Sequence, residues 1–162
     1  MNKKIMMYRF IICSSLFLFL SFFAPSSCTA TKSDKRLFEK LFLDWTTAFN
    51  QKKLAETCDL FAPSVTALYQ GIPQKNYVSI CDGFKKIFQD PNKNYQYHFK
   101  LHHIYRSNNL AAIRITWYLN IIENKKQIAS IQDEGLDILE KQPQGQWKIV
   151  NYVAFPVLKK NE

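Results

Sequence analysis

The sequence has few glycines and lacks the motifs of nucleotide-binding and hydrolytic enzymes. Only four of its 162 residues are glycine, which argues against Gly-rich repeats and phosphate-cradling loops. No P-loop, dinucleotide fingerprint or Ser-His-Asp motif is present. The cysteines and histidines do not have the spacing of a zinc site. We therefore expect neither a metal ion nor a cofactor.

The three histidines all fall in one predicted strand. His98 and His102 share a strand face but lie about 13 Å apart, too far to bind one metal ion without a bend. We interpret His98 as a polar group of a pocket or interface. We expect His102 to be exposed.

Basic residues exceed acidic ones, but not in a pattern typical of nucleic-acid binding. The formal net charge is +9, of which Lys3, Lys4 and Arg9 supply three, so residues 31–162 carry +6. The lysines are scattered along the chain and arginine is sparse. We predict solvated surface lysines and no nucleic-acid partner, with a loose attraction to anionic envelope lipids as the alternative.

Residues 1–30 have the order of a secretory signal peptide. Met1–Arg9 is basic, Phe10–Ala24 is almost wholly apolar, and residues 25–30 are small. The apolar run has about fifteen residues, whereas a bilayer span needs about twenty, so an uncleaved anchor is the lesser alternative. We predict export to the bacterial periplasm or the medium, and no transmembrane span after processing.

Two cleavage modes are open. Cys28 and Ala30 are small residues two positions apart, so an ordinary signal peptidase would leave Thr31 as the new N-terminus. Alternatively, Cys28 becomes the lipid-bearing first residue of a lipoprotein; the two serines before it fit that pattern, and Pro25 does not. Plain secretion is favoured.

The exported chain keeps Cys58 and Cys81. In an oxidising compartment the two form a disulfide if their geometry allows it. The alternative is two separate buried thiols that act as small hydrophobic side chains.

Three stretches have helical periodicity. Ser33–Asn50 is amphipathic, and Ser33 is its predicted N-cap. Lys52–Leu60 is a shorter helix that Pro63 ends, and residues 76–89 form the third.

The other segments have the alternation of strands. These are residues 65–69, 95–102, 111–121, 127–141 and 147–156, with turns at 107–109, 124–126 and 143–145. Helices followed by a run of adjacent long strands indicate an α+β fold. The full sequence has 47% hydrophobic and 22% charged residues, which is ordinary for a globular protein, and we expect residues 31–162 to form one domain.

Five segments in order resemble the SnoaL-like and ketosteroid-isomerase-like branch of the NTF2-like superfamily. They are residues 45–50, 60–65, 109–114 with Trp117, 135–139, and 142–149, and the resemblance extends over about residues 35–156. It implies a cone in which three N-terminal helices pack on a strongly curved, mostly antiparallel sheet, with a pocket at the wide end. It also implies a homodimer formed through the sheet, but no single activity.

The catalytic groups of a ketosteroid isomerase are only partly retained. By the resemblance, the phenol position falls on Trp45 and the general-base position on Tyr69, a poor base at neutral pH. The third position, a carboxylic acid, falls near Asp137. Because the base is missing, we do not expect isomerase chemistry of that kind.

Asp137 is the candidate catalytic residue, and two interpretations of it are open. It lies between apolar neighbours, so it is either a pocket acid with a raised pKa or a structural acid satisfied by Arg114 or a backbone amide.

We predict an exported domain that binds a small, largely apolar ligand, with or without catalysis. One alternative is a SnoaL-like isomerase, cyclase or hydratase that uses Asp137. The other is a dimeric envelope scaffold whose open sheet face binds protein. The predicted lining of the pocket is Trp45, Tyr69, Trp117, Asp137 and Tyr152.

Overall fold

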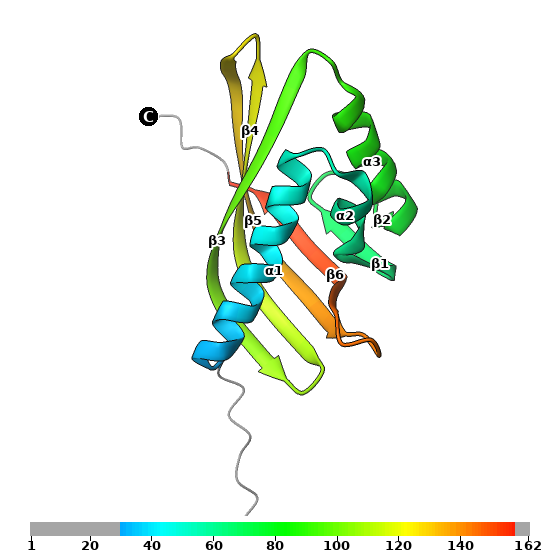
Figure 1. The fold of residues 1–162 in the computed structure, drawn as a ribbon, viewed down its shortest axis with the longest axis vertical. Helices are drawn as coiled ribbons and strands as arrows, with labels where there is room; N and C mark the ends of the chain where they lie inside the picture. Colours follow the sequence, from blue (N-terminus) through cyan, green and yellow to red (C-terminus); the bar gives the residue numbers. More distant parts are fainter. Residues whose placement is uncertain (1–29, 158–162) are drawn as a thin grey trace, which may run out of the picture.

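A computed structural model describes residues 30–157, in which three helices precede the four longest strands (Figure 1). The predicted signal peptide, apart from Ala30, lies outside the described residues, as does Cys28. No helix in the described range is both long and apolar enough to cross a membrane. The elements are α1 Lys32–Asn50, α2 Leu54–Asp59, β1 Phe61–Tyr69, β2 Lys75–Asn76, α3 Tyr77–Gln89, β3 Lys93–Ser107, β4 Leu110–Glu123, β5 Lys126–Lys141 and β6 Trp147–Pro156.

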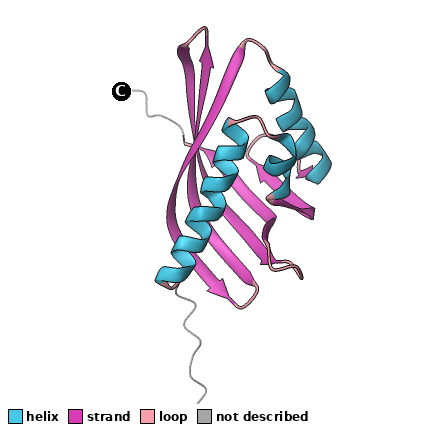
Figure 2. Ribbon diagram, in the orientation of Figure 1, coloured by secondary structure: helices cyan, strands magenta, loops and turns pink. Residues whose placement is uncertain are grey.

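The strands form one mixed sheet in the order β2-β1-β6-β5-β4-β3. β1 and β6 are parallel, and all other neighbours are antiparallel. Figure 2 shows α1 lying across the sheet, with α2 and α3 grouped beside it. The α+β class and the three helices on a curved, mostly antiparallel sheet are confirmed.

The N-cap of helix α1 lies two residues earlier than the sequence pattern predicted. Its N-cap is Thr31 rather than Ser33, because Thr31 and Asp34 form a reciprocal capping box. The Asp34 amide donates to Thr31 Oγ1 at 3.1 Å, and the Thr31 amide donates to Asp34 Oδ2 at 2.9 Å. Asp34 also pairs with Arg106, which fastens the start of the helix to β3.

The second helix is shorter than predicted, and Pro63 does not end it. α2 starts at Leu54 because Lys52 has a φ of 57°, a left-handed conformation that a helix excludes. It ends at Asp59, and β1 begins at Phe61, so Pro63 lies inside a strand. The register of β1 against β6 shifts between Phe61 and Thr66, and an irregular pairing tolerates a residue without an N–H.

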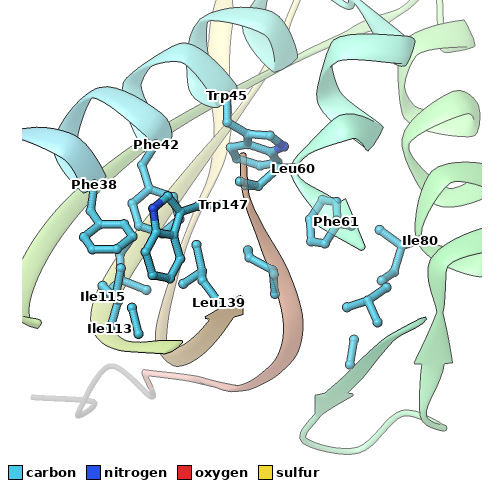
Figure 3. Close-up of a cluster of buried hydrophobic side chains, with 14 of the residues drawn as sticks. Phe38, Phe42, Trp45, Leu60, Phe61, Ile80, Ile113, Ile115, Leu139 and Trp147 are labelled. Atoms are coloured by element: carbon cyan, nitrogen blue, oxygen red, sulfur yellow. The ribbon is translucent and has the colours of Figure 1, made fainter. Parts of the chain in front are cut away.

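The core forms where α1 crosses the sheet. Phe38, Phe42 and Phe49 are fully buried on one helix stripe. Figure 3 shows the first two of them, with Trp147, above side chains that rise from the sheet. Those sheet residues are Ile113, Ile115 and Leu139, each with no exposed surface. The disulfide between Cys58 and Cys81 joins α2 to α3.

A bulge in β3 corrects the prediction for His102. The pairing with β4 shifts between Leu101 and His103, which gives His102 a new environment. His102, expected to be exposed, is half-buried, and its Nε2 lies 2.6 Å from Thr116 Oγ1. His98, which precedes the bulge, is exposed and stacks on Tyr118, with ring centroids 4.7 Å apart. It does not line the cavity described below, so its interpretation as a pocket group is wrong, and its role at an interface stays a prediction.

Candidate functional site

A cavity of about 350 Å³ lies between the sheet and the helices. This volume is within the usual range for small-molecule sites. All five residues expected to line a pocket line this one: Trp45, Tyr69, Trp117, Asp137 and Tyr152. Most of its remaining wall is apolar and comes from α3, β1, β4 and β6.

The lining runs from a buried inner end to an open mouth. Trp45, Asp137 and Ile149 each have at most 7% of their surface exposed. In contrast, Ile72 and Ile131 are 42% and 37% exposed. A ligand that fills the cavity would therefore have one end surrounded by protein and the other near water.

Asp137 is the polar group of the inner end. It lies in β5 opposite Ile113 of β4 and Tyr152 of β6, and only 3% of its surface is exposed. Its Oδ2 is buried and has no hydrogen-bond partner in the part of the chain that the structure describes. Burial raises the pKa of the carboxyl to about 7, and a hydrogen bond with the Trp117 side chain opposes the rise in part.

The interpretation of Asp137 as a structural acid held by Arg114 is wrong. Arg114 is an exposed residue whose Nη2 lies 3.7 Å from Glu134 Oε2. Successive strand residues point to opposite faces of a sheet, so Glu134 and Asp137 of β5 face opposite ways. Arg114 therefore pairs on the face that carries no cavity.

A second carboxyl, Asp133, lies on the same face of β5 nearer the mouth, and it was not among the predicted residues. The Tyr69 hydroxyl donates to Asp133 Oδ1 at 2.6 Å. Burial raises the pKa of Asp133, and the hydrogen bond from Tyr69 opposes this. Residues 133, 135 and 137 are two positions apart, which puts Asp133 on the same strand face as Asp137. Nothing in the sequence indicated Tyr69 as the partner of Asp133.

Three phenols also line the cavity. Burial raises the pKa of Tyr152 to about 12, with the charge of Asp137 adding to the effect. Burial likewise raises the pKa of Tyr69 and of Tyr97, which was also missing from the predicted set. All three phenols therefore stay protonated at neutral pH and act as hydrogen-bond donors.

The ring of Trp45 lines the cavity, whereas its indole N–H is hydrogen-bonded within the protein. Its indole Nε1 donates to the backbone oxygen of Thr57 at 2.9 Å, so α2 already uses the donor. The ring contacts Trp117, with centroids 5.0 Å apart. Trp45 thus forms an apolar part of the cavity wall, and its hydrogen bond holds α2 against α1.

The arrangement is suited to an apolar molecule that carries oxygen. Between residues 30 and 157, no three His, Cys, Asp or Glu side chains are placed to hold a metal ion. The polar groups of the cavity are two acids, three phenols and one lysine, Lys75, within an aromatic and aliphatic wall. An acid whose pKa is near 7 can give or take a proton at neutral pH.

No family model matches this sequence, and neither does any curated protein. Solved structures do match its fold. A ketosteroid isomerase-like protein from Erwinia carotovora atroseptica SCRI1043 has a TM-score of 0.63 and 13% identity, covering 80% of this chain and 100% of its own. An NTF-2 like protein of unknown function from Shewanella oneidensis MR-1 has a TM-score of 0.64 and 17% identity, covering 75% and 98%.

A third similar structure holds a bound compound. It is a protein from Catenulispora acidiphila solved in complex with S-DNPA, with a TM-score of 0.64 and 11% identity, covering 78% of this chain and 95% of its own. At these identities the likeness concerns the fold and not the activity. The chain thus has the NTF2-like fold of the ketosteroid isomerase-like proteins.

Proposed function

We propose that this chain is an exported domain that binds a small, largely apolar ligand in its cavity, with one oxygen or nitrogen of the ligand at Asp137. The observation that carries the proposal is the buried Oδ2 of Asp137, which has no hydrogen-bond partner among residues 30–157. Buried polar atoms are nearly always hydrogen-bonded, because leaving one unpaired costs about 1–3 kcal/mol. A ligand group at this position would satisfy it.

The wall of the cavity supports an apolar ligand body. Trp45, Phe61, Phe84 and Trp117 offer aromatic surface to it. The complex of the similarly folded Catenulispora protein with S-DNPA supports a ligand-binding role for this fold. Neither observation identifies the compound, so the proposal specifies its chemistry rather than its name.

Export is supported by two separate features. The basic, apolar and small segments of residues 1–30 have the order of a signal peptide. The disulfide between Cys58 and Cys81 is typical of proteins that fold in an oxidising compartment.

The test is to find the ligand and then remove its polar partner. Protein purified from the cell envelope should show a bound small molecule by native mass spectrometry. Asp137→Asn keeps the shape of the side chain but removes the acid, so occupancy should fall. Ile128→Ala, at an exposed residue outside the lining, is the control. Equal occupancy in both variants would refute the role of Asp137.

An isomerase, cyclase or hydratase is the second candidate, and one observation favours it. Asp133 and Asp137 face a single cavity, and burial raises the pKa of both. Two carboxyls with different environments can divide the roles of base and acid. Conversion of a β,γ-unsaturated ketone, followed by proton NMR, would support this candidate if Asp137→Asn abolished turnover while the ketone still bound.

The third candidate is a dimer or scaffold formed through the sheet face away from the helices. Leu68, Val153 and Leu136 are neighbours in register on this face, and each is 43–44% exposed. Phe155 extends the apolar surface with 49% exposure. We propose that two copies meet here, because exposed apolar patches mark interfaces. Val153→Asp should then convert a dimer to a monomer in analytical ultracentrifugation.

A further inference from the structure

One cation lies in the wall of the cavity. Lys75 belongs to the two-residue strand β2, where it pairs with Ala67 of β1. Residues paired across a ladder point to the same face, and Ala67 is buried on the inner face. The Lys75 side chain therefore lies along the cavity and is half-buried. Among the described lining residues it carries the only positive charge.

No acid of the described chain neutralises Lys75. The ion pairs and side-chain hydrogen bonds within residues 30–157 do not include it. Asp133, the second acid of the cavity wall, is hydrogen-bonded to Tyr69. The first turn of α3, which follows Lys75 directly, also contains no acidic residue. The partial positive charge of a helix N-terminus has the same sign as the ammonium group and does not neutralise it.

The order of groups along the cavity gives the ligand a direction. Asp137, whose Oδ2 has no hydrogen-bond partner among the described residues, lies at the buried inner end. Lys75, Ala67, Tyr152 and Asp137 pair in one row across β2, β1, β6 and β5, so Lys75 and Asp137 lie at opposite ends of this row. Aromatic and aliphatic side chains line the cavity around them, and Ile72, on the loop before Lys75, is exposed. A molecule complementary to this order has a polar atom at its inner end, an apolar body and a negative charge at its outer end.

We propose that the ligand is an amphipathic monocarboxylate whose carboxylate group binds Lys75 at the mouth. This inference rests on the proposed ligand-binding function. A single ammonium group matches a single negative charge, whereas a phosphate dianion would leave one of its charges uncompensated. The net charge of +6 on residues 31–162 attracts anions to the surface as a whole.

The experiment compares three probes with the same apolar chain and different charge: decanoate, 1-decanol and decylamine. Binding to the exported protein is followed by tryptophan fluorescence, since Trp45 and Trp117 line the cavity, and by calorimetry. We expect decanoate to bind about fivefold tighter than 1-decanol, because an ion pair between partly exposed groups strengthens binding by about this factor. Decylamine should bind more weakly than either.

Two variants with opposite effects test the position of the charge. Lys75→Met should weaken decanoate by about fivefold and leave 1-decanol unchanged. Asp133→Asn should strengthen decanoate, because it removes a negative charge from the mouth. Lys85→Met is the matched control: it removes the same charge from an exposed site on α3 that does not line the cavity.

The outcomes separate this inference from the function on which it rests. Equal binding of decanoate and 1-decanol, or equal behaviour of Lys75→Met and Lys85→Met, would overturn the inference that the ligand is a monocarboxylate. Neither result would contradict the proposed binding of an apolar ligand. Tighter binding of decylamine would reverse the sign of the charge and overturn it as well. If none of the three probes binds, the proposed function fails, and this inference fails with it.

Discussion

The hydroxyl of Tyr69 donates a 2.6 Å hydrogen bond to Asp133 across the mouth of the cavity, although their strands β1 and β5 are not neighbours. Strand β6 lies between them, and its residue in this row is Ala154, paired with Tyr69 on one side and Gly135 on the other. Because Ala154 and Gly135 are small, the phenol of Tyr69 can reach over β6 to the carboxyl of Asp133 on β5.

Tyr69→Phe should therefore change the acid without changing the shape of the mouth. The hydrogen bond from Tyr69 lowers the pKa of Asp133, so its loss should raise that pKa further above the ordinary value. An NMR titration of the Asp133 carboxyl carbon in both proteins measures the difference. Identical titration curves would show that the bond does not form in solution.

Asp137 should make the protein less stable as the pH rises. Its pKa is about 7 in the folded state against an ordinary 3.8, so the folded state binds more protons between these two values. The contribution of the neutral acid to the free energy of unfolding is fully present at low pH. It is lost as the pH rises to about 7, which lowers the free energy of unfolding by an amount on the order of 2–4 kcal/mol. Above that pH the loss is constant. Asp133, whose pKa is also raised, acts in the same direction.

Thermal melting at pH 5 and pH 8 checks this expectation. The parent protein should melt at a lower temperature at pH 8, and Asp137→Asn should reduce the difference, because the amide does not ionise. The same variant should keep a melting temperature near or above that of the parent at pH 8. An unaltered difference between the two pH values would show that Asp137 is already ionised at pH 5.

Trp45→Phe should destabilise the protein more than it weakens ligand binding. Phenylalanine keeps an aromatic wall but leaves the backbone oxygen of Thr57, a fully buried residue, without its donor. The expected loss of unfolding free energy is about 1–3 kcal/mol, measured by urea denaturation. Binding of 1-decanol should change by less than the stability does. A large loss of binding in a fully stable variant would instead make the indole N–H a ligand contact.

The disulfide should contribute to stability without being required for folding. The core made by α1 and the sheet does not include either cysteine. Cys58→Ser with Cys81→Ser opens a loop with a sequence separation of 23, which should cost about 2–4 kcal/mol. The double variant should still show a cooperative thermal transition, though at lower temperature. An unfolded variant at room temperature would mean that the bond, and not the core, holds α2 and α3 in place.

The exported protein should lack about the first thirty residues, as the signal-peptide order of residues 1–30 implies. Intact-mass measurement of protein from the cell envelope distinguishes the alternatives. A start at Thr31 supports plain secretion, and a start at Cys28 with added lipid mass supports the lipoprotein. The mass of the full chain would contradict both.

The fold was largely predictable because most segments have a clear apolar period. The stripe of Phe38, Phe42 and Phe49 defined α1, and alternation defined β4 and the end of β6. Errors arose where a local contact overrides the pattern. The capping box of Thr31 moved a helix start, and the left-handed Lys52 delayed another.

The site was only half predictable, and the reason is spatial. Alternation along β5 shows that Asp133 and Asp137 share a face, but it does not show which strands lie beside them. Tyr69 reaches Asp133 across β6, and Lys75 reaches the cavity through a strand of two residues. Neither relation leaves a periodic signal in the sequence, because each depends on the order of strands in the folded sheet.

The capping box gives the choice of cleavage site an electrostatic consequence. The Thr31 amide donates to Asp34, and Asp34 also pairs with Arg106. Processing after Ala30 would convert that amide into a free α-ammonium group, placed against a carboxylate whose pKa these contacts already lower. The new N-terminus would then be held as a salt bridge in a three-residue network instead of as a free end. Processing before Cys28 would keep the neutral amide, so the two mature forms would differ in how firmly the first turn of α1 is fixed.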